Sequence, residues 1–74
     1  MRYALITGAY GGMGRAVTRA LRRMGYFVFA LDRNVEEREE NLLPIAVDLT
    51  EEESVAAAYS AVCSVTDRLD AVLH

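Results

Sequence analysis

Thr7-Gly8-Ala9-Tyr10-Gly11-Gly12-Met13-Gly14 is the stretch that decides the fold of this chain, and it holds four of the five glycines. It follows residues 3–6, an apolar run typical of a buried strand, and precedes residues whose apolar positions recur at helical spacing. The first turn of a helix has unpaired N–H groups and the positive end of the helix dipole, so it stabilises an anion without a charged side chain. Glycines let the backbone approach that anion because they have no Cβ. The stretch therefore predicts a phosphate-binding turn.

The segment after this turn has the pattern of an amphipathic helix that ends before Gly25, a natural C-terminal stop. We expect the helix to pack on a sheet through one apolar face, composed of Met13, Ala16, Val17, Ala20, Leu21 and Met24. A second helix is expected from Thr50, where Thr50 and Glu53 have the spacing of a capping box. The apolar positions of this second helix are Val55, Ala58, Tyr59, Val62 and Val65.

Three further strands are predicted at residues 26–31, 42–47 and 69–74, with Pro44 near the beginning of the third strand of the chain. Alternating strands and helices imply a parallel sheet with right-handed crossovers, here a doubly wound α/β sheet in the strand order 3-2-1-4. Ligands of such sheets bind outside the carboxyl ends of the strands, where the winding direction reverses. The residues at those ends are Thr7, Asp32, Asp48 and His74.

Composition narrows the classes of partner. The net charge of −3 and the pI near 5.0 give no electrostatic footprint for nucleic acid or an anionic membrane. All eight basic residues are arginine, which excludes a Walker-type phosphate loop because that loop needs a lysine. The single cysteine, Cys63, permits no internal disulfide, so we expect a packing role for it and a cytoplasmic protein. The acidic residues between positions 36 and 40 are expected to form a solvated loop rather than a metal site.

Three motifs in this order resemble those of the short-chain dehydrogenase/reductase family over essentially the whole chain. The glycine segment of that family, T-G-x-x-x-G-x-G, is matched by Thr7, Gly8, Gly12 and Gly14. Its acidic residue after the second strand corresponds to Asp32, and its D-x-T-like segment to residues 48–50. Gly11 also satisfies T-G-x-x-G-x-x-G, the pattern of the extended branch, but residues 13–16 and 67–70 favour the classical branch. The segment between the second and third strands is short and leaves little room for the usual helix.

The resemblance implies a Rossmann-like sheet and a dinucleotide bound at its switch point. The residues that it places against the adenosine ribose and the pyrophosphate are Gly8, Tyr10, Gly11, Gly12 and Met13. Gly14 would let the helix approach the strand closely. Asp48 and Leu49 would meet the adenine, although Asp48 is also placed to cap the following helix.

The resemblance also indicates NAD rather than NADP. Asp32 would accept hydrogen bonds from the ribose hydroxyls and repel a phosphate at the 2′ position. Arg33 is the counter-argument, because a basic residue after the acid can turn onto a 2′-phosphate. The position before Gly12 is a glycine and offers no cation.

The family transfers hydride between a nicotinamide and an alcohol or carbonyl, using a serine and a tyrosine with a lysine four residues later. None of the four tyrosines here has such a lysine. We therefore expect residues 1–74 to be a single partial domain, a truncated cofactor-binding fragment without catalytic residues. The alternative is a noncatalytic nucleotide-binding or assembly module, in which the open edge of the fourth strand pairs with another chain.

Overall fold

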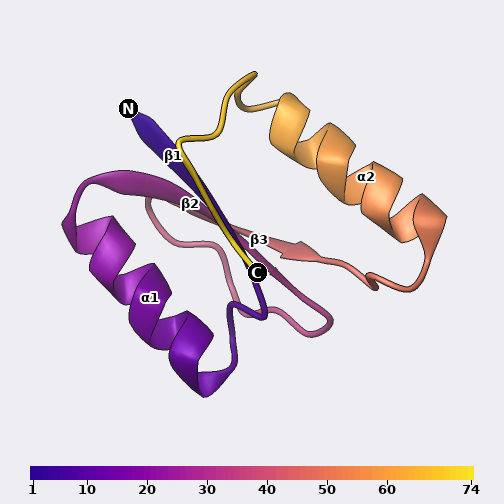
Figure 1. The fold of residues 1–74 in the computed structure, drawn as a ribbon, viewed down its shortest axis with the longest axis horizontal. Coiled ribbons are helices and arrows are strands. Elements are labelled where there is room, and N and C mark those ends of the chain that lie inside the picture. Colours follow the sequence, from indigo (N-terminus) through magenta and orange to yellow (C-terminus); the bar gives the residue numbers. More distant parts are fainter.

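The fold has six elements, which the computed structural model describes over residues 1–74 (Figure 1). The strands are β1 (Arg2–Thr7), β2 (Tyr26–Asp32), β3 (Leu42–Ala46) and β4 (Ala71–Leu73). The helices are α1 (Gly12–Arg23) and α2 (Glu52–Cys63). All strand pairs are parallel and the order is β3-β2-β1-β4, which confirms the α/β sheet and the strand order predicted from the sequence. Neither helix is long and apolar enough to span a membrane.

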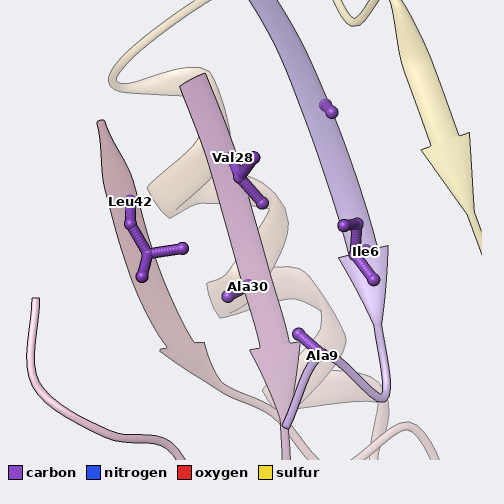
Figure 2. Close-up of a cluster of buried hydrophobic side chains, with 6 residues drawn as sticks. Ile6, Ala9, Val28, Ala30 and Leu42 are labelled. Carbon is purple, nitrogen blue, oxygen red and sulfur yellow. The ribbon is translucent and has the colours of Figure 1, made fainter. Parts of the chain in front are cut away.

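The two helices lie on opposite faces of the sheet, and each covers its own core (Figure 1). On the α1 face, Val17 and Leu21 pack against a cluster of buried side chains from three strands and the turn after β1. Figure 2 shows the side chains of that cluster. That cluster consists of Ala4, Ile6, Ala9, Val28, Ala30 and Leu42. The α2 face buries Phe29, Leu31, Val47, Ala58 and Val62. Strand β2 contributes to both cores, so its apolar run is buried on both sides, as the sequence predicts.

Helix α1 buries a different face from the one that its sequence indicates. Thr18 is buried between Val17 and Leu21, whereas Met13 is 83% exposed and Met24 57% exposed. Ala16 and Ala20 are also exposed, so only part of the predicted face packs on the sheet. The rotation of the helix follows from its first turn, where the Gly14 backbone lies directly against the turn after β1.

The start of α2 also differs from the prediction. The helix begins at Glu52 after the N-cap residue Glu51, and no side chain caps it. The capping box is wrong because the Thr50 hydroxyl donates to Oδ1 of Asp48 at 2.6 Å and does not serve the helix. Within α2 only Ala58 and Val62 are buried. Val55, Tyr59 and Val65, together with the lone cysteine, are exposed.

Strands β3 and β4 are shorter than predicted, and Pro44 lies in the middle of β3 rather than near its beginning. The proline is tolerated there because β3 is an edge strand, paired only with β2. The connection between β2 and β3 contains no helix, as its length indicates. It ends at Asn41, whose φ of 58° lies in the left-handed region.

The close approach at Gly14 predicts a specific loss of stability. A Cβ at this position would lie 2.1 Å from the carbonyl oxygen of Gly8 and 2.8 Å from Cα of Ala9, so Gly14→Ala must displace backbone atoms. We expect its free energy of unfolding, measured by urea denaturation, to fall by about 2 kcal/mol or more. The matched control is Gly12→Ala on the same turn, where a Cβ meets nothing within 4 Å and stability should change by less than about 1 kcal/mol. Equal losses in the two variants would contradict this account of the turn.

Candidate functional site

The turn after β1 is pinned to the end of β2 by backbone hydrogen bonds. Gly8 has a φ of 63°, which an L side chain rarely adopts, and its carbonyl oxygen accepts from the N–H of Gly11 at 3.2 Å. The N–H of Ala9 donates to the carbonyl of Leu31 at 3.2 Å. The glycine turn is therefore held beside the end of β2, where Asp32 lies.

The N-terminus of α1 presents donors that the protein does not use. Gly11 is the N-cap residue, it provides no side-chain cap, and no acidic residue lies in the first turn. The first helical N–H groups, those of Gly12, Met13 and Gly14, have no intrahelical partner because of their position. With the positive end of the helix dipole behind them, these groups have the arrangement that favours an anion.

Asp32 is fixed by the backbone on both of its oxygens. The N–H of Tyr10 donates to Oδ2 at 3.0 Å, and the N–H of Arg33 donates to Oδ1 at 2.8 Å. No guanidinium pairs with this carboxylate. Because each carboxylate oxygen can accept more than one hydrogen bond, the group remains free to accept from hydroxyl groups of a ligand. The turn and Asp32 are thus parts of one rigid unit.

Asp48 lines the same cavity as Asp32 and is held by its own neighbours. Its Oδ1 accepts from the hydroxyl of Thr50 at 2.6 Å and from the N–H of Thr50 at 3.0 Å, while Arg33 lies 3.4 Å from Oδ2. These contacts, the Thr50 hydroxyl first, hold the pKa of Asp48 below its ordinary value. The N–H of Asp48 donates to Oγ of Ser54 in α2 at 2.8 Å. Asp48 therefore organises the turn that leads into α2, without capping the helix itself.

Two neighbouring cavities at this edge of the sheet bring most of the sequence-predicted residues together. One, of about 240 Å³, is lined by Gly8, Asp32, Arg33, Asp48 and Leu49, among others. The other, of about 210 Å³, lies between the start of α1 and the end of β4, and its lining includes Met13, Gly14 and His74. Tyr10, Gly11 and Gly12 line neither of these cavities, and Tyr10 lines a separate one beside α1.

Three residues of this edge have contacts that the sequence did not reveal. Nδ1 of His74 lies 2.8 Å from the hydroxyl oxygen of Thr7, which joins the ends of β4 and β1. Arg15 donates from Nε to the carbonyl of Tyr10 at 3.0 Å and forms an ion pair with Glu36. The Arg15 contacts lower the pKa of Glu36. The contact between His74 and Thr7 could have been predicted from the parallel pairing of β4 with β1, which brings their ends together. Nothing local in the sequence indicates that Arg15 pairs with Glu36.

The sequence of this chain is similar to those of known dehydrogenases. The family model for short chain dehydrogenases matches residues 2–74. Among curated relatives, dehydrogenase/reductase SDR family member 11 is 36% identical in Bos taurus and 35% identical in Homo sapiens. Each alignment covers 99% of this chain and 33% of the relative, so the chain spans about a third of their length. The alignments run over 85 positions, more than the 74 residues here, so the relatives contain residues without a counterpart.

Solved structures of related proteins have the same fold as this chain. A 3-ketoacyl-(acyl-carrier-protein) reductase from Brucella melitensis, solved with NADH, superimposes with a TM-score of 0.84 at 29% identity. The match covers 96% of this chain and 32% of that one. A short chain dehydrogenase family protein from Francisella tularensis has a TM-score of 0.82 at 28% identity, and the match covers 100% of this chain and 31% of that one.

The contacts of Asp48 predict how stability depends on pH. A carboxyl group whose pKa is depressed by folding stabilises the protein when ionised, and this contribution is lost as the pH falls through and below 3.8, the ordinary value. Thr50→Val removes the largest cause of the shift, so the loss of unfolding free energy between about pH 6 and about pH 3 should be smaller than in the unchanged protein. Thr66→Val is the control, because the Thr66 hydroxyl contacts only the backbone of Arg68. Identical pH profiles for Thr50→Val and the unchanged protein would refute the role of this hydroxyl.

Proposed function

The chain belongs to the short-chain dehydrogenase family, and we propose that residues 1–74 form the adenosine and pyrophosphate part of an NAD site in an oxidoreductase. One observation carries the proposal. The turn that leads into the unpaired N–H groups of α1 is tied to the backbone-fixed carboxylate of Asp32 by the hydrogen bond from the N–H of Tyr10. N–H groups that can donate to a phosphate thus lie beside a carboxylate that can accept hydrogen bonds from ribose hydroxyls, as a nucleotide requires.

In this proposal the pyrophosphate lies against Gly12 and Met13, and the adenine-side ribose lies against Asp32. The adenine enters the cavity lined by Asp48 and Leu49, which has about 240 Å³ of space. The Brucella melitensis reductase was solved as a complex with NADH, which supports a nicotinamide dinucleotide as the ligand class. Gly14 contributes by allowing the helix to come close enough to the turn.

The charges at the ribose end favour NAD over NADP. A 2′-phosphate beside the Asp32 carboxylate would experience repulsion of up to about 4 kcal/mol at 4 Å and an effective dielectric constant near 20. Arg33 could offset this repulsion, but its guanidinium is engaged by the Asp48 carboxylate at 3.4 Å. The ribose hydroxyls, in contrast, can donate to the free lone pairs of Asp32.

The proposed reaction class is hydride transfer between a nicotinamide and an alcohol or carbonyl. The bound cofactor would supply the nicotinamide. Within residues 1–74 no lysine is present to assist a tyrosine. The role proposed for these residues is to bind and orient the cofactor. We place the protein in the cytoplasm, where its exposed Cys63 would remain a thiol.

A second candidate function is an assembly module, and one observation favours it. Strand β4 pairs only with β1, which leaves its other edge open, and the side chain of Val72 in this strand is 62% exposed. Open apolar strand edges tend to pair with another strand. A second copy of the chain could add its own β4 to this edge.

The NAD proposal predicts a change in cofactor preference. Asp32→Asn retains the size of the side chain but removes its charge, so NAD binding should weaken by about tenfold, and the preference for NAD over NADP should narrow. Dissociation constants for both dinucleotides can be measured by calorimetry. Asp67→Asn is the control, since this exposed aspartate makes no hydrogen bond or ion pair. An unchanged ratio in Asp32→Asn would remove Asp32 from the site.

The assembly candidate predicts a concentration-dependent dimer in sedimentation velocity. Val72→Lys should abolish that dimer, because a lysine on an edge strand opposes pairing. Val65→Lys, at an exposed apolar position outside the sheet, should leave it unchanged. A protein that stays monomeric at all concentrations would exclude assembly through β4.

A further inference from the structure

Arg15 is linked to Asp32 through the backbone of Tyr10. Its Nε donates to the carbonyl oxygen of Tyr10 at 3.0 Å, and the N–H of Tyr10 donates to Asp32 at 3.0 Å. The guanidinium also lies over the Tyr10 ring, 5.3 Å from the ring centroid. The pKa of Arg15 is raised chiefly by its hydrogen bond to Glu36 and, to a smaller extent, by the negative charge of Asp32.

The carboxylate of Glu36 binds both terminal nitrogens of the Arg15 guanidinium. Nη1 of Arg15 lies 3.2 Å from Oε1 of Glu36, and Nη2 contacts Oε2, which makes a bidentate pair. Arg33, the other cation near Asp32, is paired with Asp48. Both cations near the ribose end therefore have their own carboxylate, while Asp32 pairs with neither of them.

The Arg15–Glu36 pair can open without disturbing the core. The side chains are 45% and 59% exposed, so replacing Glu36 removes this ion pair without opening the core. The β2–β3 connection is also tied to α1 by Arg22, which pairs with Glu39 at 3.4 Å and donates to the carbonyl of Glu40 at 2.7 Å. Between the two ties lies a cavity of about 120 Å³, so the connection does not pack tightly against α1 at this point.

We propose that Glu36 is a specificity-determining residue for the dinucleotide, because it holds the Arg15 guanidinium away from the 2′ position of the adenosine ribose. The proposal rests on the proposed NAD site. With Glu36 in place, a 2′-phosphate meets Asp32 and finds both neighbouring cations occupied. Without Glu36, the flexible arginine side chain is free to turn toward a 2′-phosphate and form charge-assisted hydrogen bonds with it.

The test is to measure the dissociation constants of NAD and NADP for the 74-residue chain and for Glu36→Gln. Releasing Arg15 from an exposed ion pair should tighten NADP binding by about fivefold, while NAD binding changes by less than about twofold. Glu39→Gln is the matched control, because it breaks the other ion pair between the same connection and α1 but leaves Arg15 in place. It should leave both constants unchanged. Adding Arg15→Ala to Glu36→Gln should remove the gain for NADP.

Each contrary result has a distinct meaning. An unchanged NADP-to-NAD ratio in Glu36→Gln, or a gain that persists without Arg15, would overturn the specificity role while leaving the NAD site intact. An equal gain in Glu39→Gln would also overturn it, since the effect would then come from loosening the connection. Failure of the unchanged chain and of every variant to bind either dinucleotide would overturn the proposed NAD site, and the specificity role with it.

Discussion

The contact between Gly14 and the turn after β1 is the constraint on which the rest of the site depends. A Cβ at position 14 would lie 2.1 Å from the Gly8 carbonyl oxygen, so only a glycine fits here in the first turn of the helix. This contact sets the rotation of α1 and places its unpaired N–H groups at the carboxyl edge of the sheet. The turn that Gly14 packs against continues to Tyr10, whose N–H donates to Asp32. The turn at this contact therefore brings together the N–H groups of α1 and the carboxylate of Asp32.

Charge at the site is arranged locally rather than through the net charge of the chain. The proposed phosphate site uses backbone N–H groups and the helix dipole, so it needs no lysine, and the chain has none. The arginines nearest to Asp32 are neutralised by Glu36 and Asp48. An acidic chain can thus combine the proposed phosphate site with the proposed acidic ribose site, because each group acts over a short range in water.

The strand order and the meeting of the glycine turn with Asp32 and Asp48 could be predicted, because they follow from alternation of elements and from the handedness of crossovers. The buried face of α1 could not, since Met13 and Thr18 are placed by the approach of Gly14 and not by hydrophobicity. The capping box failed because Asp48 competes for the Thr50 hydroxyl. Such contacts depend on side-chain geometry between segments, which periodicity does not encode.

The central claim is that the first turn of α1 and Asp32 together bind a dinucleotide. The most direct measurement is a titration of the ¹⁵N-labelled chain with NAD, followed by the chemical shifts of its backbone amides. If the dinucleotide binds as proposed, the largest shifts occur at Gly12, Met13 and Gly14, with further shifts at Asp32 and Leu49. Saturating NAD that leaves the amides of the first turn unchanged, or shifts concentrated on the outer face of α2, would contradict it.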